Sequence, residues 1–341
     1  MQQKYFTFLG LLLFLFISLT TCLKNFNNPI IPAKNSPDPG AIFHGGFYYV
    51  VTTAGQTDTS KFPIHRSKDM LSWELVDYVF PKGDLPKWAN PLSSFWAPEL
   101  HVVNGKFMVY YTGREKSSGI LCIGVGTAEQ ITGPYKDRGT PLIKNTTVGS
   151  IDATVMAVDG GDYYLVWKDD GNGASPALPT WIWAQKLTAN GLDVTGGKTQ
   201  LIRNTLAWEA NLVEGPWVIK RNDYYYLFYS GHSYCDKTYA VGVARSKNPL
   251  GPYEKKGDPI LKTAGQWSGP GHCSVIEDHE NAGNFVMIYH AWFKENICGK
   301  NKRLLVANYL KWTITGWPEM KSINLRMTGQ DVLRALEKEE E

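Results

Sequence analysis

The feature that most constrains this chain is a strand-like segment that recurs five times at nearly constant spacing. The copies are rich in Tyr, Phe, Val and Ile, which favour β-strands, and their first residues lie 60, 56, 61 and 61 positions apart. They are Phe47–Thr52, Phe107–Thr112, Tyr163–Lys168, Tyr224–Tyr229 and Phe285–His290. A turn rich in Gly, Asn or Asp and an earlier apolar segment precede each copy, as in a β-hairpin. Such a period indicates repeated structural units rather than a sandwich of unrelated strands.

Two further segments complete the repeat unit. Leu121–Ala128 and Tyr239–Ser246 follow the second and fourth copies as third strands, and edge segments come after them at Gly133–Ile143 and Gly251–Leu261. The edge segments begin 118 residues apart, which is two units of 59. A single unit cannot bury both of its faces, so the units are expected to pack side by side in a ring. The sequence therefore predicts an all-β fold, a five-bladed β-propeller over residues 28–318.

Chain length and charge limit the classes of partner. With 341 residues and a hydrophobic fraction of 43%, the chain can form a large core. Its net charge is only +3 and its basic residues form no stripe, which argues against nucleic acid as a partner. The charged tail at residues 319–341 is predicted to be a short helix or an irregular end, and we assign it no function. We expect a monomer.

Residues 1–22 have the pattern of a secretory signal peptide. Lys4 supplies the positive start, Phe8–Leu19 the apolar stretch and Thr20–Cys22 the short polar end. The apolar stretch is shorter than the roughly 20 residues of a membrane span, which makes a signal anchor the weaker interpretation. Lipidation of Cys22, as in a bacterial lipoprotein, is a further alternative. The mature protein is therefore expected to be secreted and to have no membrane span.

The four remaining cysteines permit disulfides in a secreted chain. Cys235 and Cys298 lie in polar loops after strong strands and are the favoured pair among three pairings. Cys122 and Cys273 lie in apolar strand-like sequence and are expected to stay as buried thiols. Asn145 begins an Asn-Thr-Thr glycosylation acceptor, which has meaning only in a eukaryotic host.

The candidate chemistry lies where the first strand of each unit begins, since first strands line the channel of a propeller. The five opening positions are Asp38, Ala97, Asp152, Glu214 and His272, with gaps of 59, 55, 62 and 58 residues. Three carboxylates are thus predicted to converge at one end of one axis. Prolines on both sides of Asp38 stiffen the backbone that presents its carboxylate.

Three acids in an enclosed site are suited to acid–base catalysis. Crowded carboxylates raise at least one pKa, which produces a general acid at neutral pH. Two carboxylates about 6.5–9.5 Å apart, with a water between them, form the arrangement of an inverting glycosidase. Asp152 and Glu214 belong to neighbouring units, so Asp152 is expected to raise the pKa of Glu214, whereas Asp38 approaches from another side of the ring.

The motifs at these openings resemble those of glycoside hydrolase family 43. They are Pro37-Asp38-Pro39, Phe95-Trp96-Ala97-Pro98-Glu99, Ser150-Ile151-Asp152, Glu214-Gly215-Pro216 and Gly269-Pro270-Gly271-His272. The resemblance covers roughly residues 28–318. It implies a five-bladed propeller enzyme that cleaves arabinan, arabinoxylan or xylan side chains, with Asp38 as general base, Glu214 as general acid and Asp152 as the residue that tunes and orients the acid.

The resemblance also implies a calcium ion in the central channel, which His272 reaches through water. The alternative is that His272 only hydrogen-bonds within the channel. The chemistry itself requires no cofactor. Sugar rings stack on aromatic faces, so Phe95 and Trp96 are the predicted platforms, with Trp208 and Trp292 as further candidates and His290 as another substrate contact.

Three readings of the function stay open. The first is an α-L-arabinofuranosidase or an endo- or exo-arabinanase, with a β-xylosidase as the alternative within the same mechanism. A second is a glycosidase of a related propeller family that works with retention, for which the two carboxylates would lie about 5–5.5 Å apart. The third is a propeller that binds glycans without cleaving them, and three converging acids argue against it.

Overall fold

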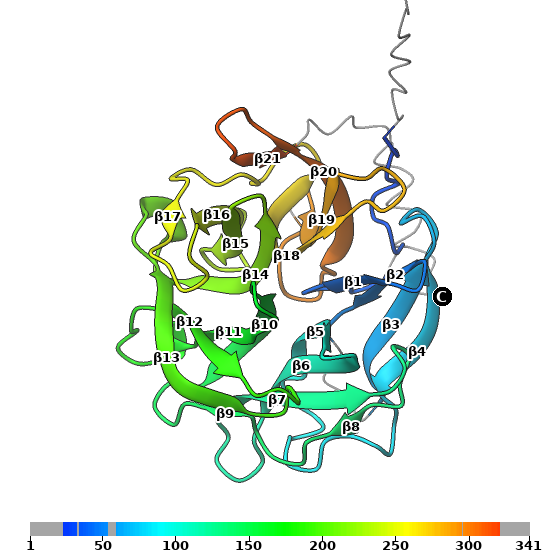
Figure 1. Cartoon of the computed structure of the whole chain (residues 1–341), viewed down its shortest axis with the longest axis vertical. Coiled ribbons are helices and arrows are strands. Elements are labelled where there is room, and N and C mark those ends of the chain that lie inside the picture. Colours follow the sequence, from blue (N-terminus) through cyan, green and yellow to red (C-terminus); the bar gives the residue numbers. More distant parts are fainter. Residues whose placement is uncertain (1–22, 33, 54–58, 295, 321–341) are drawn as a thin grey trace, which may run out of the picture.

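The computed structural model describes residues 23–32, 34–53, 59–294 and 296–320, in which five antiparallel sheets form a ring (Figure 1). Each sheet consists of strands that are consecutive in sequence. This confirms the predicted five-bladed β-propeller. The predicted signal peptide at residues 1–22 and all but the first two residues of the 319–341 tail lie outside the described residues.

The blades follow one another along the chain. Blade one has β1 (Gly40–His44), β2 (Phe47–Val51), β3 (Lys61–Ser67) and β4 (Glu74–Phe80). Blade two has β5 (Trp96–Val103), β6 (Lys106–Arg114), β7 (Leu121–Ala128), β8 (Lys136–Asp137) and β9 (Ile143–Lys144). Blade three has β10 (Ser150–Ala157), β11 (Tyr163–Asp169), β12 (Trp181–Leu187) and β13 (Val194–Arg203). Blade four has β14 (Val213–Arg221), β15 (Tyr224–Gly231), β16 (Ala240–Ser246) and β17 (Glu254–Lys255). Blade five has β18 (Trp267–Glu277), β19 (Phe285–Phe293), β20 (Leu304–Trp312) and β21 (Pro318–Met320).

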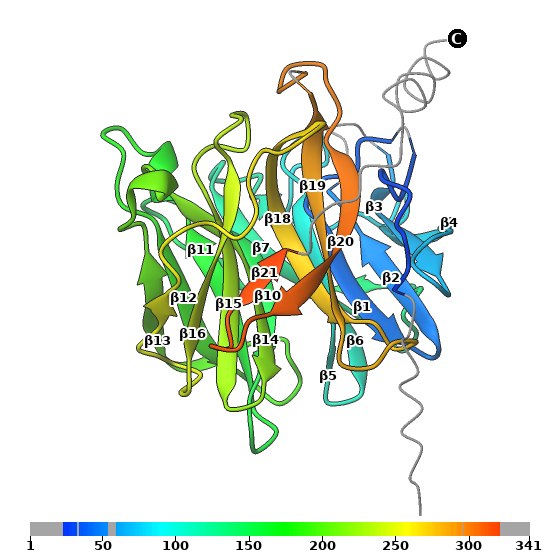
Figure 2. The same cartoon turned by 90° about the horizontal axis from the view of Figure 1, so that it is seen from above.

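The first strand of each blade lies next to the central axis. β1, β5, β10, β14 and β18 contact one another in ring order, and β18 closes the ring onto β1. Figure 2 shows the strands of the blades running through the thickness of the disc. The recurrent segments of the sequence are the second strands, β2, β6, β11, β15 and β19. All first strands therefore begin at the same end of the channel.

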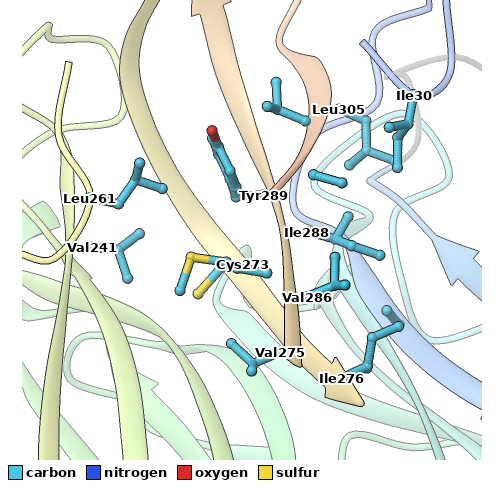
Figure 3. Close-up of a cluster of buried hydrophobic side chains, with 14 of the residues drawn as sticks. Ile30, Val241, Leu261, Cys273, Val275, Ile276, Val286, Ile288, Tyr289 and Leu305 are labelled. Carbon is cyan, nitrogen blue, oxygen red and sulfur yellow. The ribbon is translucent and has the colours of Figure 1, made fainter. Parts of the chain in front are cut away.

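The apolar faces of neighbouring blades pack against each other. In one cluster, Cys273 and Val275 of β18 lie with Val241 of blade four on one side, and Ile288 of β19 lies with Leu305 of β20 (Figure 3). These side chains alternate along their strands, as expected where both faces of a sheet are covered. Packing between blades, rather than within one sheet, thus forms the core.

Blades two and four contain the same stacking of a Trp on a Tyr. In blade four it involves Trp208, one of the predicted sugar platforms. Trp88 stacks on Tyr111 with 6.1 Å between ring centroids, and Trp208 stacks on Tyr229 with 5.8 Å. Each indole lies where glycines of the second and third strands leave room, Gly113 and Gly124 in blade two and Gly231 and Gly242 in blade four. The Trp208 indole N–H donates to the Gly257 carbonyl at 2.7 Å. Trp208 thus packs within blade four as Trp88 packs within blade two, and its role as a sugar platform stays a prediction.

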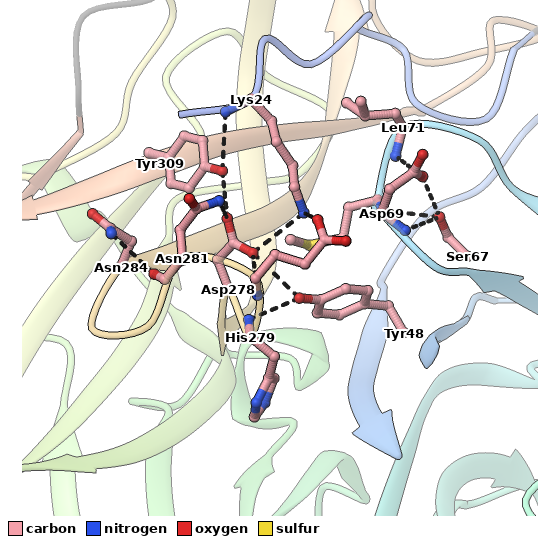
Figure 4. A network of polar contacts seen from close by, with 12 residues as sticks. Lys24, Tyr48, Ser67, Asp69, Leu71, Asp278, His279, Asn281, Asn284 and Tyr309 are labelled. Carbon is pink, nitrogen blue, oxygen red and sulfur yellow. Dashed lines mark hydrogen bonds and ion pairs between the residues drawn. The ribbon is translucent and has the colours of Figure 1, made fainter. Parts of the chain in front are cut away.

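A segment before blade one fastens blade five to blade one. The Asn28 side chain donates to the Ala307 carbonyl at 2.9 Å and accepts the Ala307 N–H at 2.8 Å. Earlier in the same segment, Lys24 lies against the buried carboxylate of Asp278. This carboxylate also accepts hydrogen bonds from Tyr309 at 2.6 Å and Tyr48 at 3.3 Å (Figure 4). Tyr48 belongs to blade one and Tyr309 to blade five. This network therefore joins the two blades at which the ring closes.

We expect Asn28→Ala to lower the free energy of unfolding by about 2–4 kcal/mol, because two buried backbone groups of Ala307 lose their partner. Chemical denaturation followed by fluorescence measures the change. Ile314→Ala serves as the control, since Ile314 is fully exposed on a distant hairpin and its loss should cost no more than about 0.5 kcal/mol. Equal stability of the two variants would contradict a closing role for Asn28.

The cysteines are arranged as predicted. Cys235 and Cys298 form a disulfide between loops of blades four and five, with Cα atoms 5.1 Å apart. Cys122 and Cys273 are free and buried. No helix within the described ranges has the length and apolar character that a membrane crossing requires.

Candidate active site

A left-handed residue lies just before the first strand of blade one and within the first strand of each other blade. These residues are Asp38, Ala97, Asp152, Gly215 and His272, with φ between 44° and 57°. In blades two to five the strand pairing shifts register at this point. The predicted opening position in blade four was Glu214, so the structure corrects the alignment by one residue. A left-handed conformation is strained for non-glycine residues and is often found at functional sites.

The preceding blade holds each of these residues in place. The backbone N–H of Ala97 donates to Thr53, that of Asp152 to Thr112, and that of His272 to Ser230, at 2.8–3.1 Å. The N–H of Asp38 donates to Nδ1 of His290 at 3.2 Å. Each partner pairs with the residue immediately before the left-handed residue of its own blade. The same backbone contact, repeated around the ring, therefore brings the openings together.

Asp38 is a buried carboxylate surrounded by donors. Its Oδ2 accepts the Thr53 hydroxyl at 2.6 Å, and its Oδ1 lies 2.7 Å from Arg303 and 3.6 Å from His272 Nδ1. Burial by itself would raise the pKa of Asp38, but Arg303, His272 and His290 lower it well below its ordinary value. Asp38 is thus ionised at neutral pH. Because a carboxylate with a lowered pKa is a weak base, it takes a proton from a water molecule only as that water reacts.

Glu214 lies between two donors from neighbouring elements. Lys168 of β11 approaches its Oε2 at 3.0 Å, and the Tyr239 hydroxyl donates to its Oε1 at 2.8 Å. Burial favours a raised pKa, but the Lys168 charge and these hydrogen bonds lower the pKa of Glu214 below its ordinary value. The ring of Tyr239 also stacks on His290 with 5.8 Å between centroids, which links the surroundings of Glu214 to those of Asp38.

Asp152 is the acid of the three whose pKa is raised. Its Oδ2 accepts the Gly215 N–H at 3.1 Å, beside the acid. Burial is the main cause that raises the pKa of Asp152 to about 6, and the charge of Glu214 adds to it. We predicted that Asp152 would raise the pKa of Glu214. The net direction for Glu214 is downward instead, because Lys168 stands at 3.0 Å from its carboxylate.

The remaining predicted contacts fall into two groups. Phe95 lies in the core, where it is only 2% exposed and stacks on Tyr111, and its role as a sugar platform stays a prediction. Trp96 is half-buried at the start of β5 and stays a candidate. His290 is fully buried against Asp38, and burial lowers its pKa to about 4. Its Nδ1 accepts the Asp38 N–H and lies 3.3 Å from Asp38 Oδ1, and its contact with sugar stays a prediction. Trp292, 3% exposed, is also a core residue.

The residues around His272 do not fit a directly bound calcium ion. Calcium prefers six to eight oxygen ligands, whereas His272 offers one nitrogen that faces Asp38. Across the described part of the chain, no three His, Cys, Asp or Glu side chains gather as a metal-binding group. His272 Nδ1 lies 3.6 Å from Asp38 Oδ1, and its contact with a calcium ion through water stays a prediction.

Sequence reasoning missed four residues that touch the acids: Thr53, Lys168, Tyr239 and Arg303. Lys168 and Tyr239 were read as strand residues, and Arg303 follows the segment that contains Cys298. Arg303 and Asp38 lie 265 positions apart in the sequence, so no local sequence pattern indicates their contact. Only Lys168 had a recognisable signal, because a lysine at the inner end of an apolar second strand must find a counter-charge.

Comparisons with known proteins agree with this geometry. The family model for glycosyl hydrolases family 43 matches residues 26–318. Extracellular endo-α-(1→5)-L-arabinanase 1 of Bacillus subtilis (strain 168) is 29% identical over 300 residues, which cover 82% of this chain and 86% of that protein. Extracellular exo-α-(1→5)-L-arabinofuranosidase ArbA of Cellvibrio japonicus (strain Ueda107) is 27% identical over 320 residues, with coverage of 83% and 85%.

A solved structure shows the same architecture. The crystal structure of a thermostable family-43 glycoside hydrolase aligns with a TM-score of 0.77 and 26% identity, covering 88% of this chain and 96% of that one. The family model spans most of the chain and includes all three axial acids. The chain therefore belongs to glycosyl hydrolases family 43 and is a glycosidase.

Proposed function

We propose that this chain is a secreted, inverting glycosidase of arabinose-containing plant polysaccharides. The observation that carries the proposal is the difference in protonation among three neighbouring buried acids. The pKa of Asp38 is lowered well below its ordinary value, whereas burial and the charge of Glu214 raise the pKa of Asp152 to about 6, so the Asp152–Glu214 pair releases its proton at a higher pH than Asp38 does. One ionised base and one proton source are the two requirements of single-step inversion.

In the proposed reaction, Asp38 removes a proton from a water molecule as the water oxygen attacks the anomeric carbon. The glycosidic C–O bond breaks, and Glu214 gives its proton to the leaving oxygen. The proton that the pair shares moves from Asp152 to Glu214 before the step. After the step Asp38 releases its proton to solvent, and the Asp152–Glu214 pair takes one up. Thr53 and Arg303 hold the two oxygens of Asp38, so the carboxylate can meet the water in one orientation only.

The names of two relatives favour arabinan as substrate. Both the Bacillus subtilis and the Cellvibrio japonicus proteins are described as acting on α-(1→5)-linked L-arabinose and as extracellular. We therefore place an arabinanase or α-L-arabinofuranosidase first. A β-xylosidase is the second candidate, since the Humicola insolens relative, 32% identical over 68% of this chain, is named a xylosidase/arabinosidase. The extracellular relatives also support export by the predicted signal peptide.

A product profile tests the proposal. The purified mature chain is incubated with linear arabinan, debranched arabinan and xylo-oligosaccharides, and the anomer released first is read by NMR. We expect arabinose or arabino-oligosaccharides of inverted configuration. Products of retained configuration would contradict the mechanism. Binding of these glycans without any hydrolysis would support the non-catalytic alternative instead.

A further inference from the structure

Lys168 occupies an inter-blade position at which the other four blades place a side chain that can accept a hydrogen bond. In those blades Thr53, Thr112, Ser230 and His290 accept the backbone N–H of the next blade's left-handed residue. Lys168 is equivalent by register, because it pairs with Ile151, the residue immediately before Asp152. A lysine ammonium group has three donors and no acceptor. It therefore cannot hold the N–H of Gly215, and Asp152 takes over that contact.

The lysine reaches past the backbone to the acid instead. Its Nζ lies 3.0 Å from Glu214 Oε2 and 3.0 Å from Asp170 Oδ1, and its side chain is only 1% exposed. The charge is thus shared between one acid on the channel and one on the loop after its own strand. Burying an unpaired ammonium group costs free energy, so packing alone does not explain a lysine at this position.

We propose that Lys168 is the positioning residue of the general acid, and that its charge decides the pH at which the Asp152–Glu214 pair loses the catalytic proton. The inference deepens the proposed function and rests on Glu214 being the acid. The other groups that face Glu214 are the Tyr239 hydroxyl, the charge of His272 and the carboxyl of Asp152. Asp38 faces Asp152 from blade one.

Electrostatics gives the direction of the effect. A positive charge next to a carboxylate favours its ionised form, and two interacting carboxyls titrate as a pair. With Lys168 in place, the proton stays on Asp152, and the pair loses it at a lower pH than it would without the lysine. The alkaline limb of kcat/KM reports this loss, because it follows the protonation of the free enzyme.

The test compares pH profiles of kcat/KM on an unactivated arabino-oligosaccharide. Lys168→Thr introduces the residue that blades one and two carry at this position, and it should move the alkaline limb upward by about 1–3 pH units. Lys168→Arg keeps the charge and should leave the limb near its wild-type position. Lys198→Thr is the matched control, since Lys198 pairs with Asp169 at 3.3 Å and does not contact Glu214.

A second variant covers the case in which Lys168→Thr does not fold. Asp170→Asn removes the competing partner, so the whole charge of Lys168 acts on Glu214. The alkaline limb of the kcat/KM profile should then move to lower pH. An unmoved limb in either folded variant overturns the inference. Failure of the proposed function is distinguished by Glu214→Gln: if that variant keeps its activity on the same oligosaccharide, Glu214 is not the acid, whatever Lys168 does.

Discussion

Glu214→Gln is expected to lower kcat/KM on arabino- or xylo-oligosaccharides by about 10²–10⁴-fold, the range typical of a lost general acid. Glutamine keeps the size of the side chain, so its amide oxygen can still accept from Lys168, and its amide N–H can donate to the Tyr239 hydroxyl. The variant cannot donate a proton to the oxygen of the leaving sugar, which would otherwise depart as an alkoxide. The loss should therefore be large for natural leaving groups and much smaller for a nitrophenyl glycoside, whose leaving group needs little protonation.

The dependence on leaving group separates chemistry from structure. A variant that merely distorts the channel would lose activity on both substrates alike. Glu129→Gln is a matched control, because Glu129 is exposed and pairs only with Lys106 on the outer part of blade two. Unchanged activity of Glu214→Gln on oligosaccharides would remove Glu214 from the mechanism.

Asp38→Asn is expected to lower kcat by about 10²–10⁴-fold, with no recovery on nitrophenyl glycosides. The asparagine amide cannot accept the proton of the attacking water, and this need does not depend on the leaving group. It also leaves the Arg303 guanidinium at 2.7 Å without its negative partner. The two acids thus give opposite results with an activated substrate, and this contrast assigns their roles.

A smaller variant checks the role of the base directly. In Asp38→Gly, azide can enter the space of the carboxylate and attack without a general base, so added azide should restore turnover and yield a glycosyl azide of inverted configuration. The absence of this product, together with a folded variant by circular dichroism, would contradict Asp38 as the base. Asp77→Asn provides an exposed control on the outer strand of blade one.

Much of the fold was predictable because its causes are local and repeated. Segments rich in Tyr, Phe, Val and Ile and turns that contain Gly, Asn or Asp recur at intervals near 59 residues, and each copy reinforces the others. The acids Asp38, Asp152 and Glu214 were predictable for the same reason, since a repeat places equivalent positions at one end of the channel. Register at the level of one residue was not, as the correction from Glu214 to Gly215 shows.

The packing of the predicted aromatic platforms could not be read from sequence. Phe95 immediately precedes β5, and Trp208 lies in the short 3-10 turn Ala207–Glu209. The structure stacks these two rings on Tyr111 and Tyr229. Such contacts depend on strands that come together only when the blade forms.

The sequence by itself determined the number of blades, the level at which the acids converge and the identity of those acids, because all three follow from spacing along the chain. Only the tertiary structure decided the pKa of each acid. Arg303, His290 and Lys168 come from different blades than the carboxylates they face. A pKa responds to charge and burial within a few ångströms, and such distances exist only after the ring has closed.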